Sequence, residues 1–244
     1  MSLLTILFAV LLNVAVLVFV LGLARKIRSN ARTPAPLKIP TTPAPITAAG
    51  VGWRMAREVV FFESLFKSSK WTWIFGWMFH AALLLVLLRH ARYFQEPVWL
   101  PVVLIQPFGT YAGFAMVAGL GGLWARRWLV DRVRYISTPS DHLMLVLLLA
   151  IGLTGLGMRF VSHTDIVAVK VFMLGLLRFD WQPLPSDPVL LVHLALVALL
   201  MIIFPISKLL HAPGLFFSPT RNQTDNAREL RHVSAWTNAL DKKA

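Results

Sequence analysis

Four histidines lie in long apolar stretches of the sequence, two in each of two stretches. His80 and His90 belong to residues 71–94, and His193 and His211 lie at the two ends of residues 189–211. Ionisable side chains are costly inside a bilayer, so histidines in such stretches point to function. A separation of eighteen residues is five helical turns, which places His193 and His211 on one helix face. A separation of ten residues leaves His80 and His90 about 80° apart, still on one broad face.

Two such helices running antiparallel would bring the histidines together as two imidazole pairs, His80 with His211 and His90 with His193. An iron held by two imidazoles has no open coordination position, which suits electron transfer rather than oxygen chemistry. The sequence contains no cysteine, which excludes covalently attached haem, thiolate-ligated iron–sulfur clusters and disulfides. The pattern therefore predicts two haem b groups at two depths, each with two histidine ligands. Any one histidine taken alone could instead be a polar residue satisfied between helices.

The spacing of the pairs also predicts an irregularity in the second stretch. At about 1.5 Å per residue, His80 and His90 are about 15 Å apart along a helix, and His193 and His211 are about 27 Å apart. Straight parallel helices cannot match both depths. Helix tilt and a kink at Pro205 therefore have to absorb the difference.

These histidines belong to a sequence whose composition excludes an ordinary soluble domain. Hydrophobic residues make up 57% of the 244 residues and charged residues 14%, against about 45–50% and about 25% in soluble proteins. A helix needs about 20 apolar residues to span a bilayer. We expect an all-α integral membrane protein with five transmembrane helices, in which residues 71–211 form a four-helix haem-binding core. The predicted spans are residues 1–24, 71–94, 100–124, 142–161 and 189–210.

Charge asymmetry predicts the orientation of these spans. Nineteen of the 24 lysines and arginines fall in residues 25–70, in the loop after the third span, and in the tail from residue 208 onward. The five others lie toward the opposite side. Positively charged loops stay in the cytoplasm, so we expect the N-terminus outside and the C-terminus in the cytoplasm. The net charge of +13 is thus a topology signal, with some attraction to anionic lipid, and gives no indication of nucleic-acid binding.

The segments outside the spans predict surface elements on both sides of the membrane. On the cytoplasmic side we expect a proline-rich linker (33–45), an amphipathic segment (53–67) and a tail (212–244). The amphipathic segment could dock a partner or simply anchor at the interface. On the outer side, residues 165–179 are apolar but too short to span. They could form an interfacial or re-entrant helix with Asp165 as its N-cap.

The four-histidine spacing resembles a known family. The pattern His80-x9-His90 with His193-x17-His211 resembles that of respiratory nitrate reductase gamma subunits. The segments FPISKLLH (204–211) and DRVRYISTPSDHLMLVLLL (131–149) do so as well, and the resemblance covers all five spans. It implies a dihaem cytochrome b that exchanges electrons with membrane quinone and a cytoplasmic iron–sulfur subunit. The chain would then be the electron-transfer subunit of a quinone-linked oxidoreductase, with terminal catalysis on its partners.

Within that family, the proline-rich linker and residues 57–80 (REVVFFESLFKSSKWTWIFGWMFH) resemble the membrane cytochromes of Dsr complexes (DsrM-like), which are linked to dissimilatory sulfur metabolism. This resemblance implies a DsrK-like iron–sulfur subunit and other Dsr subunits as partners. It also implies the cytoplasmic (inner) membrane of a bacterium or archaeon as the location. The alternative is the gamma subunit of a nitrate-reductase-type complex. The sequence departs from the pattern of those subunits near the predicted quinone site. Arg89 stands where they have a glycine, and the region after Pro101, where they have a lysine, offers Gln106 instead.

Polar residues near the two imidazole pairs are candidates for contacts with haem propionates or a quinone head group. The outer-side candidates are Arg89 and Arg92, with Gln106 as a quinone contact, and the cytoplasmic-side candidates are Arg126, Arg127 and Lys208. The outer arginines could equally extend to the membrane interface without touching a cofactor. The cytoplasmic cations could reflect only the positive charge of that face.

Two other classes of function are compatible with the sequence. A haem-free membrane anchor would use the same spans to recruit cytoplasmic subunits, and a small transporter could relay protons through the histidines. A reduced-minus-oxidised absorption spectrum of the purified protein separates both from an electron carrier, because only bound haem gives a b-type band.

Overall fold

The computed structural model describes residues 2–34 and 38–229, and every regular element in those residues is a helix. Residues 35–37 of the predicted linker and 230–244 of the predicted tail lie outside the described residues. Five of the helices are long and apolar enough to cross a membrane, which confirms the predicted all-α fold with five spans. These are Leu3–Arg32, Lys70–Phe94, Leu100–Leu129, Pro139–Phe160 and Pro188–Ile206.

Short helices connect and flank the long ones. The long helices are α1 (Leu3–Arg32), α4 (Lys70–His90), α5 (Leu100–Leu129), α7 (Pro139–Phe160) and α9 (Pro188–Ile203). The short α-helices are α2 (Ala48–Phe61), α3 (Glu63–Ser68), α6 (Asp131–Ile136), α8 (Ile166–Arg178), α10 (His211–Gly214) and α11 (Pro219–Asn222). The 3-10 turns are η1 (Ala91–Phe94), η2 (Phe204–Ile206), η3 (Lys208–Leu210) and η4 (Leu215–Phe217).

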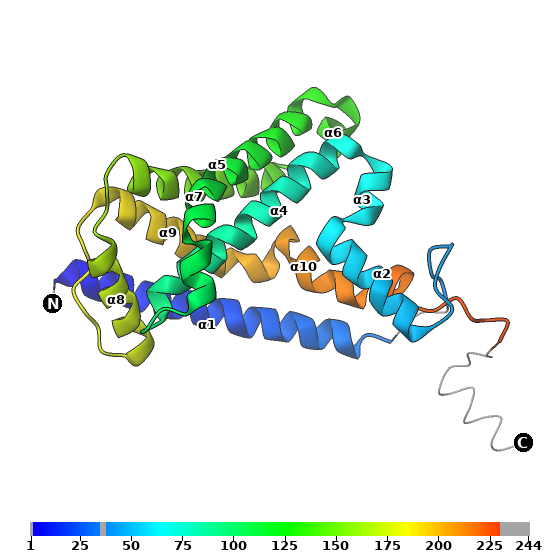
Figure 1. Ribbon diagram of the computed structural model, residues 1–244, viewed down its shortest axis with the longest axis horizontal. Coiled ribbons are helices and arrows are strands. Elements are labelled where there is room, and N and C mark those ends of the chain that lie inside the picture. Colours follow the sequence, from blue (N-terminus) through cyan, green and yellow to red (C-terminus); the bar gives the residue numbers. More distant parts are fainter. Residues whose placement is uncertain (1, 35–37, 230–244) are drawn as a thin grey trace, which may run out of the picture.

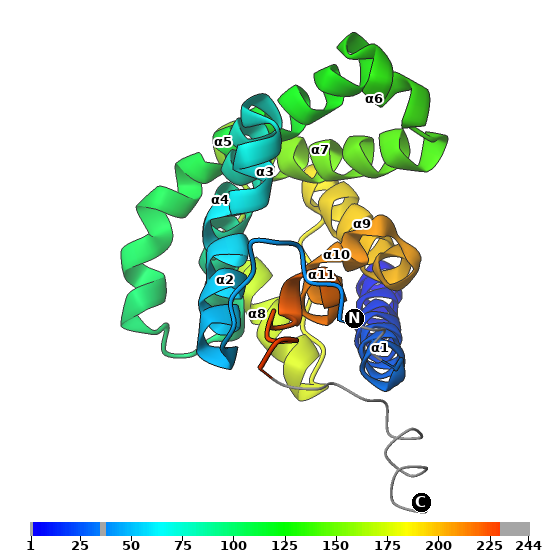
Figure 2. The same cartoon turned by 90° about the vertical axis from the view of Figure 1, so that its right-hand side faces the viewer.

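The long helices form an arc in which each packs on the next, in the order α1, α9, α7, α5 and α4. Figure 2 shows α4 and α9 on opposite arms of this arc, joined through α7 and α5. In the described part of the chain, α4 and α9 themselves have no more than marginal direct contact. Figure 1 shows α8 at one end of the molecule and α2 and α3 at the other. We call these the α8 end and the α2 end.

Two buried apolar clusters hold the arc together. One cluster joins α1, α8 and α9, with Phe8, Phe172 and Leu190 among its members. The other joins α4 to α5 through Phe79 and Met116. The histidine-bearing helices α4 and α9 therefore belong to different clusters, and each is held mainly by its own neighbours.

Glycines of α5 let it approach α4 closely. A Cβ added at Gly109 would lie 2.7 Å from the Cβ of Arg89 and 2.9 Å from the carbonyl oxygen of Leu85. At Gly119 an added Cβ would lie 3.0 Å from the carbonyl oxygen of Phe75. Small residues at such contacts allow close backbone packing between membrane helices. The glycines thus fix the helix that carries His80 and His90.

Gly109→Ala is expected to lower thermal stability, because the new methyl group meets backbone atoms of α4. Overpacking costs about 1–3 kcal/mol, which outweighs the gain of about 1 kcal/mol that alanine has over glycine in a helix. Gly121→Ala is the matched control, since a Cβ there meets no atom within 4 Å. Thermal unfolding in detergent should give a lower midpoint for Gly109→Ala only. Equal midpoints for the two variants would contradict close packing at Gly109.

The fifth span ends where the sequence predicts a kink. Helix α9 stops at Ile203, and two 3-10 turns lead to α10, which begins at His211. Proline has no N–H to continue the helical ladder, which explains the stop near Pro205. The proline ring also packs against α1, because a Cβ added at Gly22 would lie 2.5 Å from the Cβ of Pro205. The structure therefore has a helix end at this point.

The predicted amphipathic segment forms two helices, α2 and α3, that meet at Phe62. This residue has a left-handed backbone conformation with φ of 51°. Trp73 and Trp77 of α4 donate their indole N–H groups to the carbonyls of Phe61 (2.6 Å) and Val60 (2.9 Å). The last carbonyls of a helix lack intrahelical partners, so these bonds satisfy the end of α2 and hold it beside α4.

The linker and the C-terminal segment lie side by side at the α2 end. The N–H of Thr41 donates to the carbonyl of Thr220 (3.0 Å), and the N–H of Asp225 donates to the carbonyl of Pro45 (2.9 Å). Arg221 of α11 pairs with a glutamate of α2 at 2.9 Å. Residues 38–45 are thus fastened to residues 220–226, although about 180 residues separate them.

Candidate haem site

The structure places the four histidines in two pairs, one toward the α2 end and one toward the α8 end. The ring centres of His80 and His211 are 5.9 Å apart, and those of His90 and His193 are 6.5 Å apart. Each pair joins α4 to the chain of α9 and α10, which α4 otherwise barely touches. Because α9 ends at Ile203, His211 reaches His80 without the rise of about 27 Å that a continuous helix would impose.

These distances fit an iron atom held between two imidazoles. Two iron–nitrogen bonds of about 2 Å, with about 1.1 Å from each nitrogen to its ring centre, separate the ring centres by roughly 6 Å. The separations of 5.9 and 6.5 Å bracket that value. Haem needs only two protein ligands because the porphyrin supplies four. A non-haem metal needs more, and no three His, Asp or Glu side chains gather in the described residues.

Backbone hydrogen bonds orient three of the four imidazoles. His80 and His90 each hold Nδ1 2.7 Å from the carbonyl oxygen four residues earlier in α4. His211 holds Nδ1 3.1 Å from the carbonyl oxygen of Lys208. A carbonyl oxygen can only accept, so Nδ1 carries the proton in each ring and the lone pair is on Nε2. Metal-ligating histidines are held in this way, with one nitrogen donating to a carbonyl and the other free for the metal.

His193 also carries its proton on Nδ1, but its hydrogen-bond partner is a threonine of α7. Its Nδ1 lies 2.9 Å from the hydroxyl oxygen of Thr154, and that hydroxyl donates its proton to the carbonyl of Ala150 at 2.7 Å. The hydroxyl therefore accepts from Nδ1 of His193, which leaves Nε2 of this buried ring free. Sequence reasoning missed Thr154, although a hydroxyl in an otherwise apolar span is a signal that could have found it.

Aromatic side chains surround the imidazoles of α4. The rings of Phe79 and Phe62 lie edge-on to His80, with centroids 4.7 and 5.0 Å away. Phe62 is the left-handed residue between α2 and α3, so the break in the amphipathic segment places a ring against this histidine. Near the α8 end, the ring of Tyr93 lies 5.9 Å from that of His90.

Polar contacts outside the spans fix the start of α9 and the position of α8. The carboxylate of Asp187 caps α9 by accepting from the N–H of Val189 at 2.9 Å. A hydrogen bond from the hydroxyl of Thr164 lowers the pKa of that carboxyl below its ordinary value, and the N–H groups of α9 act in the same direction. Lys170 of α8 pairs with Glu96 at 2.7 Å. The predicted helix at residues 165–179 is therefore present, and it is tied to the turn that follows His90.

The predicted polar candidates near the α8 end contact one another. Arg92 donates to the amide oxygen of Gln106 at 3.0 Å, and the amide nitrogen of Gln106 donates to the carbonyls of Val102 (2.9 Å) and Arg89 (3.4 Å). Gln106 thus uses both ends of its amide to join α4 and η1 to α5. The stem of Arg89 lies against Gly109 of α5. Contacts of these side chains with a haem or a quinone stay predictions.

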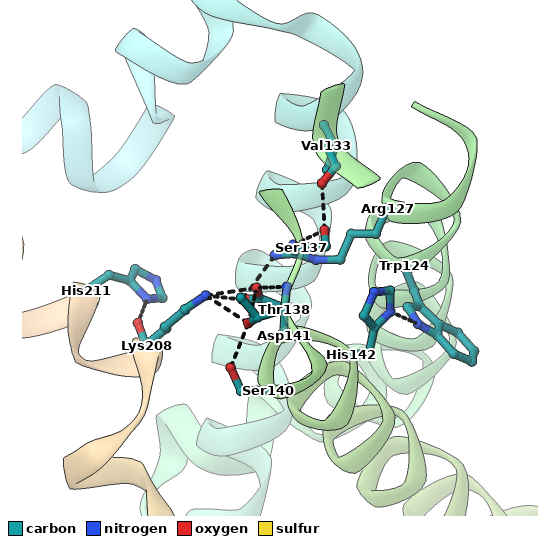
Figure 3. Close-up of polar contacts among 10 residues, drawn as sticks. All are labelled: Trp124, Arg127, Val133, Ser137, Thr138, Ser140, Asp141, His142, Lys208 and His211. Carbon is teal, nitrogen blue, oxygen red and sulfur yellow. Dashed lines mark hydrogen bonds and ion pairs between the residues drawn. The ribbon is translucent and has the colours of Figure 1, made fainter. Parts of the chain in front are cut away.

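Two of the three predicted candidates at the α2 end contact a buried carboxylate (Figure 3). Asp141 of α7 has both oxygens 2.8 Å from Nζ of Lys208, and one oxygen 3.7 Å from a guanidinium nitrogen of Arg127. Thr138 donates its N–H (2.9 Å) and hydroxyl (2.8 Å) to the same carboxylate. Lys208 and Arg127 therefore have a partner within the chain, whereas Arg126 has no polar side-chain contact among the described residues. Propionate contacts for these three cations stay predictions.

Sequence reasoning also overlooked Asp141. The run T-P-S-D at 138–141 directly precedes an apolar stretch, which is a capping-box pattern that could have indicated it. The neighbouring His142 points away from Lys208 in Figure 3, and its Nδ1 accepts from the indole N–H of Trp124 at 3.2 Å. It takes no part in either histidine pair.

Two kinds of comparison with known proteins bear on this geometry. Residues 46–226, which include both histidine pairs and exclude α1, match the sequence profile of the nitrate reductase gamma subunit. Two similar proteins are each named Hdr-like menaquinol oxidoreductase cytochrome b-like subunit. The protein of Archaeoglobus fulgidus is 37% identical, over 91% of this chain and 81% of its own length. That of Archaeoglobus profundus is 33% identical, over 90% of this chain and 79% of its own length.

The family match extends over most of the chain, from before α2 to the end of α11. It includes the segments at 131–149 and 204–211 on which the resemblance was drawn. The resemblance is therefore confirmed. The chain with these two histidine pairs belongs to the nitrate reductase gamma subunit family.

Proposed function

We propose that the chain is a dihaem cytochrome b subunit that passes electrons between membrane quinol and a cytoplasmic iron–sulfur subunit. His80 and His211 would hold one haem b, and His90 and His193 the other. Haem b, when bound, supplies a one-electron donor and acceptor with no open coordination position. We base this on one observation: all four imidazoles keep Nδ1 hydrogen-bonded and Nε2 without a hydrogen bond among the described residues, in pairs whose ring centres are 5.9 and 6.5 Å apart.

In this proposal the chain presents its ligands already oriented. Carbonyl oxygens hold three rings and the hydroxyl of Thr154 holds His193, so the tautomer of each ring is set with Nε2 as the acceptor nitrogen. His193 is buried, and Phe62 and Phe79 limit the access of water to His80. An apolar shell of this kind controls solvent access and the local dielectric at a metal site.

The relatives support menaquinol as the quinol, because the word stands in the names of both. Their names also support a place in a multisubunit oxidoreductase of the Hdr-like kind. A Dsr-type iron–sulfur partner and a role in sulfur metabolism are the finer part of the proposal, supported by the linker and by residues 57–80. The second candidate is the gamma subunit of a nitrate-reductase-type complex, which the family match favours. Identification of the subunits that co-purify from native membranes separates the two.

We further propose that the N-terminus is outside and the C-terminus in the cytoplasm, in a multi-pass protein of the cytoplasmic membrane. The uneven distribution of lysine and arginine supports this orientation. The α2 end would then face the cytoplasm and the α8 end the outside. Residues 25–70 and the tail from 212 would form the surface on which the iron–sulfur subunit docks.

The purified chain is expected to show a b-type band in its reduced-minus-oxidised spectrum and to contain two haem groups. A reduced menaquinone analogue added to the isolated complex should produce the same band without another reductant. The absence of any b-type band would contradict the proposal and favour a haem-free anchor or transporter. A band that dithionite produces and the quinol does not would contradict the quinol role alone.

A further inference from the structure

The segment that carries His211 has little regular structure to hold it. Between α9 and α10 lie only the turns η2 and η3, and Lys208 and His211 are both exposed. Within the described residues, Lys208 makes the only side-chain hydrogen bonds or ion pair that run from residues 207–214 to any of the five long helices. The place of this segment therefore depends on one polar anchor.

The anchor is the carboxylate of Asp141, which is held in place by contacts other than that with Lys208. Its side chain is 6% exposed, and it accepts the N–H and hydroxyl of Thr138 at 2.9 and 2.8 Å. It lies in the first turn of α7, where the helix dipole favours a negative charge. Lys208 then binds both oxygens at 2.8 Å, whereas Arg127 remains 3.7 Å away. Lys208 is thus the main cation on a preoriented carboxylate.

The same lysine residue orients the histidine (Figure 3). Its side chain points to Asp141, and its carbonyl oxygen accepts from Nδ1 of His211 at 3.1 Å. The rings of His80 and His90 are instead fixed by carbonyls of their own helix, and His193 by Thr154. His211 is therefore the one histidine of the four whose orientation depends on a residue held by an ion pair.

We propose, on the basis of the haem-ligand role proposed above, that Asp141 is a positioning residue for His211. Through Lys208 it sets the place of the η3–α10 segment and the ring orientation of this histidine. Asp141 touches no cofactor in this role. Its influence should be confined to the His80–His211 site, because its link to the other pair runs along α7 to Thr154, thirteen residues further on.

The test compares Asp141→Asn, Lys208→Met and the double variant in the full chain with its haem groups. We expect each single variant to hold one of the two haem groups about tenfold less tightly, as is usual when a residue that orients a metal ligand is lost. The low-spin EPR signal of that haem should change, and the other signal should not. Because Asp141 and Lys208 act through the same contact, the double variant should lose no more haem affinity than either single variant.

The matched control is Asp131→Asn, in an aspartate before the same span whose side chain is 88% exposed and pairs with Arg134. It should change neither haem. Lys208 is 68% exposed, so Lys208→Met tests the idea even if Asp141→Asn folds poorly. If Asp141→Asn alters one haem and Lys208→Met alters none, Asp141 serves only as the cap of α7 and the inference is wrong.

The result for His211→Ala separates this inference from the proposed function. If His211→Ala retains both haem groups, the proposed ligand role fails and the inference fails with it. If His211→Ala loses one haem, but Asp141→Asn and Lys208→Met each keep two haem groups with unchanged affinity and EPR signals, the inference alone is wrong. A second result would also overturn the inference. Asp141→Asn and Lys208→Met would shift the midpoint potential of one haem in opposite directions, with haem retention and EPR signals unchanged. Asp141 and Lys208 would then act through their charges and not through the position of His211.

Discussion

His193→Ala is expected to remove one of two haem groups from the protein and to leave the other bound. The reason is that the two pairs share only α4. His193 lies on α9 opposite His90, whereas His211 lies beyond the helix end and faces His80. The ratio of extracted haem to protein should fall to about half, and so should the amplitude of the b-type band, because one of two bis-histidine sites is lost.

A suitable control for this variant is His142→Ala. His142 lies at the start of a span but has aromatic partners, Trp124 through a hydrogen bond and Trp128 with a ring centroid 4.9 Å away. It should retain both haem groups. Loss of both haem groups in His193→Ala, with helix content unchanged by circular dichroism, would show that the two sites do not form independently. Retention of both would exclude His193 as a ligand.

Thr154→Val is expected to weaken the same haem without touching a ligand. Valine has the shape of threonine but removes the hydroxyl that accepts from Nδ1–H of His193 in a buried site, which costs about 1–3 kcal/mol. The ring also loses the bond that sets its tautomer, and loss of such outer contacts weakens metal binding by about 10–100-fold. The rate at which haem leaves the protein for apomyoglobin should rise for one of the two groups.

Thr110→Val provides the matched control for this experiment. Its hydroxyl donates at 2.8 Å to the carbonyl of Gln106, four residues earlier in its own helix, and no histidine of the described residues hydrogen-bonds to it. Thr154→Ser, which keeps the hydroxyl, should behave nearly as the unaltered protein. Equal rates of haem loss in Thr154→Val and Thr110→Val would mean that the threonine does not support His193.

The features that the sequence predicts best are those encoded in local patterns. Span length and apolarity predict the five long helices, and Asp165 ahead of an apolar run predicts the capped helix α8. Pro205 within the fifth stretch predicts an irregularity, because a proline has the same effect on a helix in almost any surroundings. The irregularity is larger than the predicted kink, because the α-helix ends at Ile203 and no α-helix begins again before His211.

Contacts between distant residues are what the sequence could not supply. The partner of His193 lies on α7 and the partner of Lys208 lies at the other end of the same helix, and neither follows from periodicity. Charge counting assigned Lys208 to the cytoplasmic face but could not show a buried carboxylate beside it. Gln106 stays a predicted quinone contact, and nothing in the sequence indicated that its amide joins α4 and η1 to α5.

Contacts between residues 38–45 and residues 220–226 cannot form until the ribosome has made all five spans of the described residues. Arg54 of the adjacent helix α2 donates to the carbonyl of Thr41, but the other polar bonds to residues 38–45 within the described part of the chain come from residues 220–226. During synthesis residues 38–45 must therefore lack most of their polar partners while four further helices enter the membrane. Formation of these contacts is then a late event in biogenesis. A nascent chain stopped before residue 220 would expose residues 38–45 to proteases.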